Sequence, residues 1–198
     1  MFVTLEGVDG SGKSTQARLL ADRLRSEGRE VVLTREPGGT AAGERIREIL
    51  LHGDPLTPWA EASLFAAARA QLVEEVVRPA LARGADVVAD RYLDSSLAYQ
   101  GIARGLGVEP VLELNMLATN GLVPDRTFLI LLPPAEAAAR RSGERDRIEQ
   151  EGLAFAEEVD RAYREIARVF ADRVQVVDGA LNPEDIAEIV RGQLRDLP

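Results

Sequence analysis

The stretch Gly7-Val8-Asp9-Gly10-Ser11-Gly12-Lys13-Ser14-Thr15 decides the fold that this sequence predicts. It fits the pattern G-x-x-x-x-G-K-[ST], in which glycines let successive backbone N–H groups turn inward towards phosphate oxygens. Lys13 supplies a cation for the terminal phosphates, and the Ser14 hydroxyl is placed to bind Mg²⁺. The alternative is a glycine-rich turn with a solvated lysine, but Lys13 is the only lysine among 24 basic residues. The stretch therefore predicts a binding loop for a nucleoside triphosphate.

The residues around this loop alternate between strand-like and helix-like segments. A short β-prone run, residues 2–6, precedes the loop, and apolar residues at helical spacing, 14–27, follow it. Further strands are predicted at 30–34, 86–89, 126–132 and 174–177, and further helices at 41–51, 59–81, 93–104, 110–119, 135–141, 153–170 and 183–194. This alternation predicts a three-layer α/β fold with a five-stranded parallel sheet between helices. Because no linker or repeat divides the chain, we expect one domain over residues 1–198.

Composition and charge exclude several classes of function. The sequence has no cysteine and one histidine, so disulfides, thiolate catalysis and a histidine metal cluster are ruled out. A net charge of −9 argues against sequence-independent binding to nucleic acid. No apolar run approaches the ~20 residues of a membrane span, and residues 1–6 do not resemble a secretory signal. We therefore expect a cytoplasmic protein.

Arginines and aromatic residues follow the predicted strands at their carboxyl ends, where parallel sheets bind ligands. Arg35 ends the second strand, and Arg91 comes directly after the third. Phe65 and Arg69 lie four residues apart and share one helical face, and Tyr99 lies about two turns beyond Arg91. An aromatic ring beside an arginine can stack on a base and bond its edge. Each residue alone has an ordinary alternative, which is core packing for the aromatic rings and a solvated surface for Arg69.

A charged segment between two predicted helices, at about residues 140–152, predicts a mobile lid. Arg140, Arg141, Arg145 and Arg147 lie in it. Phosphoryl transfer spreads negative charge over three oxygens, and arginines that close over them stabilise the transition state. The alternative is a solvated, charge-rich helix with local ion pairs.

The single lysine also narrows the class of nucleotide-binding protein. Small GTPases read guanine with an Asn-Lys-x-Asp motif, which this chain lacks because its lysine is in the phosphate loop. A small kinase that acts on a small acceptor agrees best with the arginines at the sheet edge. A kinase for a different small acceptor and a nucleotide-dependent switch or binding module remain as alternatives.

Four motifs in order resemble the thymidylate kinase family. They are E-G-V-D-G-S-G-K-S-T at 6–15, T-R-E-P-G at 34–38, D-R-Y at 90–92 with Ser95, Ser96, Tyr99 and Gln100, and D-R-I-E at 146–149. The resemblance extends from residue 2 to about residue 182. It implies transfer of the ATP γ-phosphoryl group to dTMP, which gives dTDP for dTTP supply, with Mg²⁺ as the cofactor.

The resemblance also implies a role for each matching residue, with about 41–80 as the acceptor-binding region. Phe65 would stack on thymine, Arg69 and Ser96 would face its edge, and Tyr99 would crowd the 2′ position. The implied dTMP residues are Asp9, Arg35, Pro37, Phe65, Arg69, Arg91, Ser96, Tyr99 and Gln100. The implied ATP residues are Gly7, Val8, Asp9, Gly10, Ser11, Gly12, Lys13, Ser14 and Thr15, with Arg140 and Ala180 near adenine. Ser14 would bind Mg²⁺, with Asp9 or Asp90 reaching it through water.

The implied catalytic residues are Lys13, Asp9, Arg141 and Arg145. Some family members carry a catalytic arginine within the phosphate loop, but here that position is Gly10, so the chain resembles the class with lid arginines. The resemblance further implies a homodimer. A candidate face is the predicted helix 59–81, with the apolar residues Leu64, Ala68, Leu72 and Val76. The alternative is that these residues pack in the ordinary core.

Overall fold

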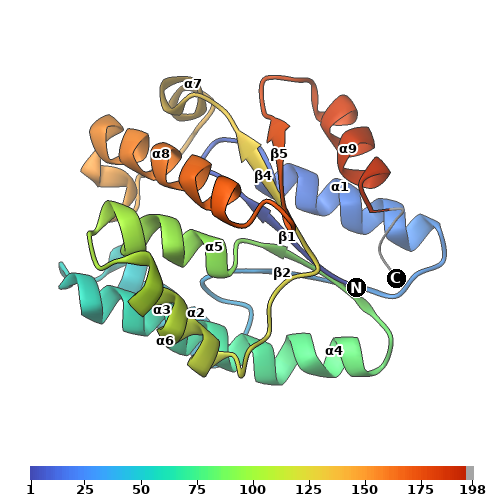
Figure 1. Cartoon of the computed structure of the whole chain (residues 1–198), viewed down its shortest axis with the longest axis horizontal. Coiled ribbons are helices and arrows are strands. Elements are labelled where there is room, and N and C mark those ends of the chain that lie inside the picture. The colour runs from blue at the N-terminus through green and yellow to red at the C-terminus, as the bar shows by residue number, and fades with distance from the viewer. Residues whose placement is uncertain (195–198) are drawn as a thin grey trace.

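Five strands form one sheet in the computed structural model, which describes residues 1–194. All neighbours pair in parallel, in the order β2-β3-β1-β4-β5 (Figure 1). The strands are β1 (Phe2–Glu6), β2 (Val31–Arg35), β3 (Asp86–Asp90), β4 (Arg126–Leu131) and β5 (Val174–Asp178). Their ends differ from the sequence prediction by at most one residue, and the predicted α/β fold is confirmed. The end of the predicted domain, 195–198, lies outside the described residues.

Helices cover both faces of the sheet. Figure 1 shows α1 and α9 on one side, and α8, α5 and α4 on the other. The helices are α1 (Lys13–Ser26), α2 (Ala41–His52), α3 (Pro58–Leu72), η1 (Val73–Val77), α4 (Arg78–Ala82), α5 (Leu93–Ser96), η2 (Leu97–Ala103), α6 (Val108–Ala118), α7 (Pro134–Ala139), η3 (Glu149–Glu151), α8 (Leu153–Val169) and α9 (Pro183–Gly192). None of the helices among the described residues has both the length and the apolar character that crossing a bilayer requires.

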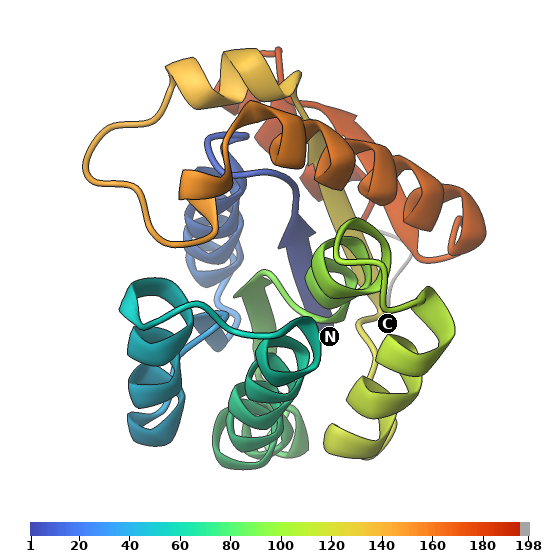
Figure 2. The same cartoon turned by 90° about the vertical axis from the view of Figure 1, so that its left-hand side faces the viewer.

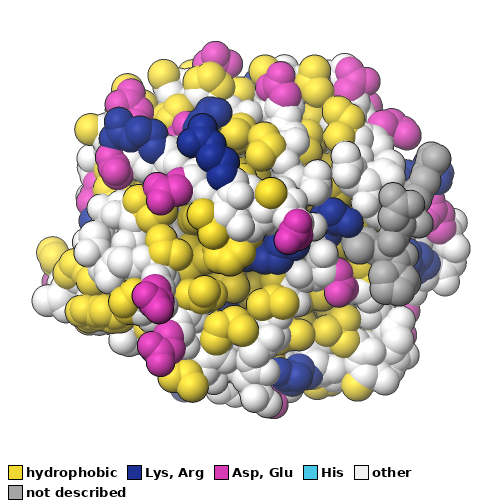
Figure 3. Space-filling view, in the orientation of Figure 1, with side chains coloured by type: hydrophobic (Ala, Val, Ile, Leu, Met, Phe, Trp, Pro, Cys, Tyr) yellow, Lys and Arg dark blue, Asp and Glu magenta, His cyan; other side chains and the backbone are white. Residues whose placement is uncertain are grey.

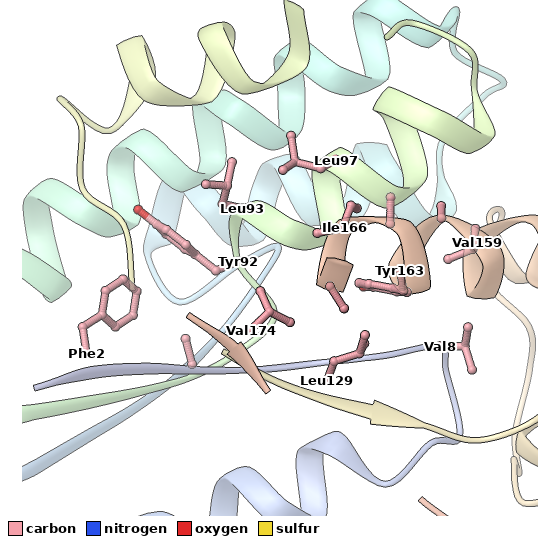
Figure 4. Close-up of a cluster of buried hydrophobic side chains, with 14 of the residues drawn as sticks. Phe2, Val8, Tyr92, Leu93, Leu97, Leu129, Val159, Tyr163, Ile166 and Val174 are labelled. Atoms are coloured by element: carbon pink, nitrogen blue, oxygen red, sulfur yellow. The ribbon is translucent and has the colours of Figure 1, made fainter. Parts of the chain in front are cut away.

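The core follows the alternation of side chains along each strand. Val3 and Leu5 of β1 pack into the cluster beneath α1 and α9, whereas Phe2 packs into the cluster on the other face. Figure 4 shows this second cluster, in which Tyr163 and Ile166 of α8 lie between α5 and the sheet. Buried strands with two covered faces explain why their sequences are almost continuously apolar.

Two predicted helices contain wider, π-helical turns. The predicted helix 59–81 runs as α3, η1 and α4, and the π turns of η1 lie directly before Pro79. Proline has no N–H and its ring collides with the carbonyl four residues earlier, which a wider turn relieves. The predicted helix 93–104 likewise continues from α5 into η2, which carries Tyr99 and Gln100.

The predicted dimer face on α3 and η1 is wrong for two of its four residues. Ala68 and Leu72 are 1% and 0% exposed, because they pack inside their own chain. Leu64 and Val76 are partly buried against the same protein's core clusters. The apolar spacing on this predicted helix therefore reflects packing in the core of its own chain.

Candidate functional site

The phosphate loop, residues 7–12, connects β1 to the first turn of α1. Gly12 precedes the helix in a left-handed conformation with φ of 97°, so the loop turns directly into the positive end of α1. Gly10 also has a positive φ of 88°, and a Cβ there would lie 2.0 Å from the carbonyl oxygen of Ala137. Because α7 packs so closely on the loop, position 10 admits no side chain. This close packing explains why residue 10 is a glycine and not an arginine.

Asp9 links two cations at the mouth of this loop. Lys13 Nζ donates to Asp9 Oδ1 at 3.0 Å, and Arg91 Nη2 donates to the same oxygen at 2.7 Å. Burial raises the pKa of Asp9, but the charges of Arg91 and Lys13 outweigh burial and hold that pKa well below its usual range. Asp9 is therefore ionised at neutral pH and holds both cations where β1 and β3 end.

Two cavities in the described part of the chain meet at this point. The first cavity, of about 220 Å³, lies among the phosphate loop, α2, α3 and the α5–η2 helix, and the second, of about 640 Å³, lies among the loop, α7, α8 and residues 141–152. Side chains that line both are Asp9, Lys13, Ser14, Tyr99 and Ile148. A ligand in one cavity can therefore approach a ligand in the other beside Lys13.

The first cavity contains most of the residues predicted to bind the acceptor. Eight of the nine line it, namely Asp9, Arg35, Pro37, Phe65, Arg91, Ser96, Tyr99 and Gln100. Phe65 offers an aromatic ring to this cavity, and Arg35 and Arg91 offer positive charge. Such a lining suits a ligand with a flat ring and an anionic group.

Arg69, the ninth predicted residue, lies behind the wall. Its side chain is 1% exposed, and its guanidinium donates to Glu36, Ser96, Asn115 and the Tyr92 carbonyl oxygen. Four of its five N–H donors make these hydrogen bonds, and Nη2 also lies 2.6 Å from Glu36 Oε2 in an ion pair. Direct contact with a base would require exchange of one of these bonds, so the prediction that Arg69 bonds the base edge is not met here. Arg69 instead holds Glu36 and Ser96 in the wall.

Glu61 sets the orientation of Gln100. Gln100 Nε2 donates to Glu61 Oε1 at 2.9 Å, and a carboxylate can only accept. Burial raises the pKa of Glu61, but hydrogen bonds from Arg104, Gln100 and Arg147 lower it overall, so the group is ionised. The carbonyl oxygen of Gln100 is therefore the atom left to accept a hydrogen bond from a ligand in the first cavity.

Sequence reasoning missed several side chains of the first cavity. Arg47 on α2 lines it and donates to the Pro37 carbonyl oxygen at 2.8 Å, and Asp146 and Ile148 reach it from the lid segment. Arg47 lies in the middle of an ordinary charged helix, which gave no signal. The D-R-I-E motif at 146–149 does give a signal, but only for a lid, and nothing in it places Asp146 and Ile148 at the first cavity.

The lid segment, residues 140–152, projects as a loop between α7 and α8 (Figure 2). Arg141 and Arg145 line the second cavity, and Arg141 Nη2 lies 2.5 Å from Glu149 Oε2. Arg147 instead ties the segment to its surroundings, because it donates to Glu61 at 2.7 Å and to a backbone carbonyl of α2 at 2.8 Å. Of the four arginines of the segment, Arg141 and Arg145 face the cavity, Arg147 anchors the loop, and Arg140 binds the Gly179 carbonyl oxygen.

The remaining residues predicted for ATP lie around the loop rather than in these cavities. Arg140 donates to the carbonyl oxygen of Gly179 at 3.0 Å, which brings it beside the turn that contains Ala180. Within residues 1–194, those that line neither cavity are Gly7, Ser11, Gly12, Thr15, Arg140 and Ala180. A ligand would meet the loop members through backbone N–H groups.

Ser14 and Asp90 offer oxygen atoms that fit a magnesium ion. Ser14 is exposed at the start of α1 and lines both cavities, and one buried carboxylate oxygen of Asp90 has no hydrogen-bond partner among the described residues. Mg²⁺ usually keeps several waters and takes only one or two protein oxygens beside phosphate.

Comparisons with known proteins agree with the motifs. Residues 5–190 match the family model described as thymidylate kinase. The thymidylate kinase of Synechococcus sp. (strain JA-3-3Ab) is 51% identical over 187 residues, which cover 94% of this chain and 91% of that protein. The thymidylate kinase of Bifidobacterium longum (strain DJO10A) is 46% identical over 202 residues, covering 100% and 98%. The crystal structure of thymidylate kinase from Ehrlichia chaffeensis has a TM-score of 0.79 at 33% identity, over 98% of each chain.

Proposed function

Since the chain belongs to the thymidylate kinase family, we propose that it transfers the γ-phosphoryl group of ATP to dTMP, forming ADP and dTDP for dTTP supply. The observation that carries this proposal is the meeting of two cavities at Lys13 and Asp9. An enzyme that moves a phosphoryl group between two ligands needs both of them within reach of the same cation.

In the first cavity, dTMP would stack its thymine ring on Phe65. Its phosphate would lie between Arg35 and Arg91, which are cationic and line the same wall. The N3–H group of thymine would donate to the carbonyl oxygen of Gln100, because Glu61 holds the amide nitrogen. Cytosine has an acceptor at this position, so the same orientation disfavours dCMP.

Three further residues would complete the acceptor site. Ser96 would face the base edge, supported from behind by Arg69 through a 2.9 Å hydrogen bond. Tyr99 would crowd the 2′ position of the sugar, which disfavours a ribonucleotide. Asp9 would meet the 3′-hydroxyl or the shell of the metal.

ATP would bind across the phosphate loop, with its terminal phosphates beside Lys13 and its adenine near Arg140 and Ala180. Ser14, with Asp9 or Asp90 through water, would hold Mg²⁺, which neutralises part of the phosphate charge. The attacking oxygen belongs to the dTMP phosphate and is mostly ionised at neutral pH, because its second pKa is about 6. The chain therefore needs no general base, and its residues act by orienting the phosphates and balancing their charge.

Arg141 and Arg145 would stabilise the charge that develops during transfer. Both line the second cavity, and neither is tied to α2 or α3 as Arg147 is. Arg141 would exchange its bond to Glu149 for the transferring group. Water exclusion would follow from closure of the lid segment over the second cavity.

We also infer that the chain forms a homodimer and acts in the cytoplasm. Support for a dimer comes from hydrophobic side chains gathered on one face of the molecule (Figure 3). Leu117 of α6 and Val169 of α8 are 77% and 66% exposed. Light scattering of the wild type and of Leu117→Glu would test this, since a wild-type monomer contradicts it.

The transfer reaction is tested by Lys13→Ala with Arg18→Ala as a matched control. Arg18 is an exposed residue of the same helix, so its loss should leave turnover unchanged. Lys13→Ala should lower kcat/KM for ATP by about 10²-fold or more, because the terminal phosphates lose their cation. Full activity of Lys13→Ala would contradict the proposed function.

A further inference from the structure

Glu6, the last residue of β1, is a buried acid with no place in the reaction described above. Its side chain is 0% exposed, and within the described chain it accepts four hydrogen bonds. The backbone N–H groups of Tyr92 and Ser95 donate to Oε1 at 2.8 and 3.3 Å. The hydroxyls of Ser95 and Tyr163 donate to Oε2 at 2.6 and 2.9 Å. One carboxylate thus joins β1, Tyr92 in the turn after β3, α5 and α8.

Arg91 takes its position from the same two hydroxyls. Its Nη1 donates to Ser95 Oγ at 3.0 Å and to Tyr163 Oη at 3.1 Å. Each hydroxyl has one proton to donate and lone pairs with which to accept. When Glu6 is ionised it only accepts, so both protons point to Glu6 and both oxygens can accept from Arg91. Glu6 therefore orients the two groups that hold this end of the guanidinium.

The backbone at Arg91 depends on Glu6 as well. Arg91 has a φ of 74°, a left-handed conformation that residues with a Cβ rarely adopt. The next backbone N–H, that of Tyr92, donates to Glu6 Oε1 and so fixes the turn. This turn directs the guanidinium towards Asp9 and the first cavity. Figure 4 shows how Tyr163 reaches inward from α8 towards the sheet on which Glu6 lies.

We propose that Glu6 is a positioning residue for the acceptor phosphate, holding Arg91 at the angle at which it binds phosphate. The proposal rests on the proposed function, in which Arg91 binds the phosphate of dTMP. Glu6 is absent from the described lining of both cavities, so it acts on a ligand only through other residues. Removal of the Glu6 carboxylate should therefore weaken the binding of ligands that carry a phosphate and leave the binding of other ligands unchanged.

Charged and titratable groups on every neighbouring element act on Glu6. Burial, together with the charge of Asp94, raises its pKa to about 7, although Arg91 and the hydrogen bonds from Ser95 and Tyr92 oppose this. Its charge also acts on Arg69, Tyr99, Tyr163 and Arg173. A proton on Glu6 would turn one of its two accepting oxygens into a donor, and the amide NH2 of a glutamine is a donor at the same place. Glutamine therefore mimics the protonated acid.

Glu6→Gln tests the proposal when dTMP is compared with thymidine, which has no phosphate. Calorimetric titration of both ligands into wild type and variant would give the four dissociation constants. We expect the constant for dTMP to rise about tenfold, the effect of one lost charge-assisted hydrogen bond, while that for thymidine stays unchanged. Equal weakening of both ligands, or unchanged or tighter binding of dTMP, would overturn the proposal.

Two companion variants keep the test decisive if Glu6→Gln fails to fold. Tyr163→Phe keeps the ring and removes one of the two hydroxyls. It should raise the dissociation constant of dTMP by a smaller factor than Glu6→Gln does and leave that of thymidine unchanged. An equal rise for both ligands, or no rise for dTMP, overturns the proposal. Asp160→Asn is the control, because this buried acid of α8 pairs with Arg164 and should leave the ratio of the two constants unchanged. If the wild type does not prefer dTMP over thymidine, Arg91 holds no phosphate, which overturns the acceptor site and the role of Glu6 together.

Discussion

Arg69→Met is expected to destabilise the fold, although sequence reasoning placed Arg69 against the ligand. The Arg69 side chain is 1% exposed, its Nε donates to the buried carboxylate of Glu36 at 2.8 Å, and its Nη2 lies 2.6 Å from the same oxygen. The other Glu36 oxygen has no partner among the described residues, so removal of Arg69 leaves a buried charge uncompensated. Breaking one side of a buried ion pair costs about 3–5 kcal/mol. Methionine fills much of the same volume, so we expect that loss in the free energy of unfolding at pH 8.

Urea unfolding followed by circular dichroism would measure this loss, with Glu36→Gln and the double variant as companions. The double variant should lose less free energy of unfolding than Arg69→Met alone, because glutamine at position 36 carries no charge and so no buried charge remains. Burial raises the pKa of Glu36, and without Arg69 nothing opposes that rise. An acid with a raised pKa stabilises the fold when protonated, so the loss in Arg69→Met should shrink as pH falls from 8 to 5. A loss below about 1 kcal/mol, the size of a surface pair, or a loss that grows on acidification, would refute the reasoning.

Gly10→Ala should unfold at a lower urea concentration than Gly28→Ala. Both glycines have a positive φ, but only a Cβ at residue 10 would meet the backbone of α7. Equal unfolding midpoints would contradict this packing. At least one of Arg141→Ala and Arg145→Ala should lower kcat for dTMP by about 10²-fold or more with less change in KM. If kcat is unchanged in both single variants and in the double variant, the lid arginines do not stabilise the transition state. The ratio of wild-type kcat/KM for dTMP to that of Glu6→Gln should fall between pH 8 and pH 6, since Glu6 gains a proton near its pKa of about 7. A constant ratio over this range would argue against the role of Glu6.

Local patterns in the sequence predicted the sheet and the phosphate loop well. Buried strands in a parallel sheet are short apolar runs, and the loop has a fixed spacing of glycines and Lys13, so both can be recognised without tertiary information. The rule that parallel sheets bind ligands at their carboxyl edge then located Arg35 and Arg91 correctly at one cavity.

Features that depend on a partner distant in sequence were not predicted. The spacing of Phe65 and Arg69 gave them one helical face, but Glu36, 33 residues away, holds Arg69 behind the wall. Apolar spacing on α3 could not distinguish an internal core from a dimer face, and Ala68 is buried within its own chain. No sequence pattern indicated the position of Glu6 either, because its four donors come from Tyr92 after β3, from Ser95 of α5 and from Tyr163 of α8.

Production of ADP from ATP and Mg²⁺, measured for a panel of dTMP, dUMP, dCMP, dAMP, dGMP and UMP, would show whether the chain phosphorylates dTMP in preference to other monophosphates. We predict that dTMP gives the highest kcat/KM and that dCMP is poor, because Glu61 turns the carbonyl oxygen of Gln100 towards the base. Preference for another monophosphate would contradict the acceptor site built from Phe65 and Gln100. Absence of turnover across the panel, with ATP still bound, would contradict the kinase itself and favour a nucleotide-dependent switch.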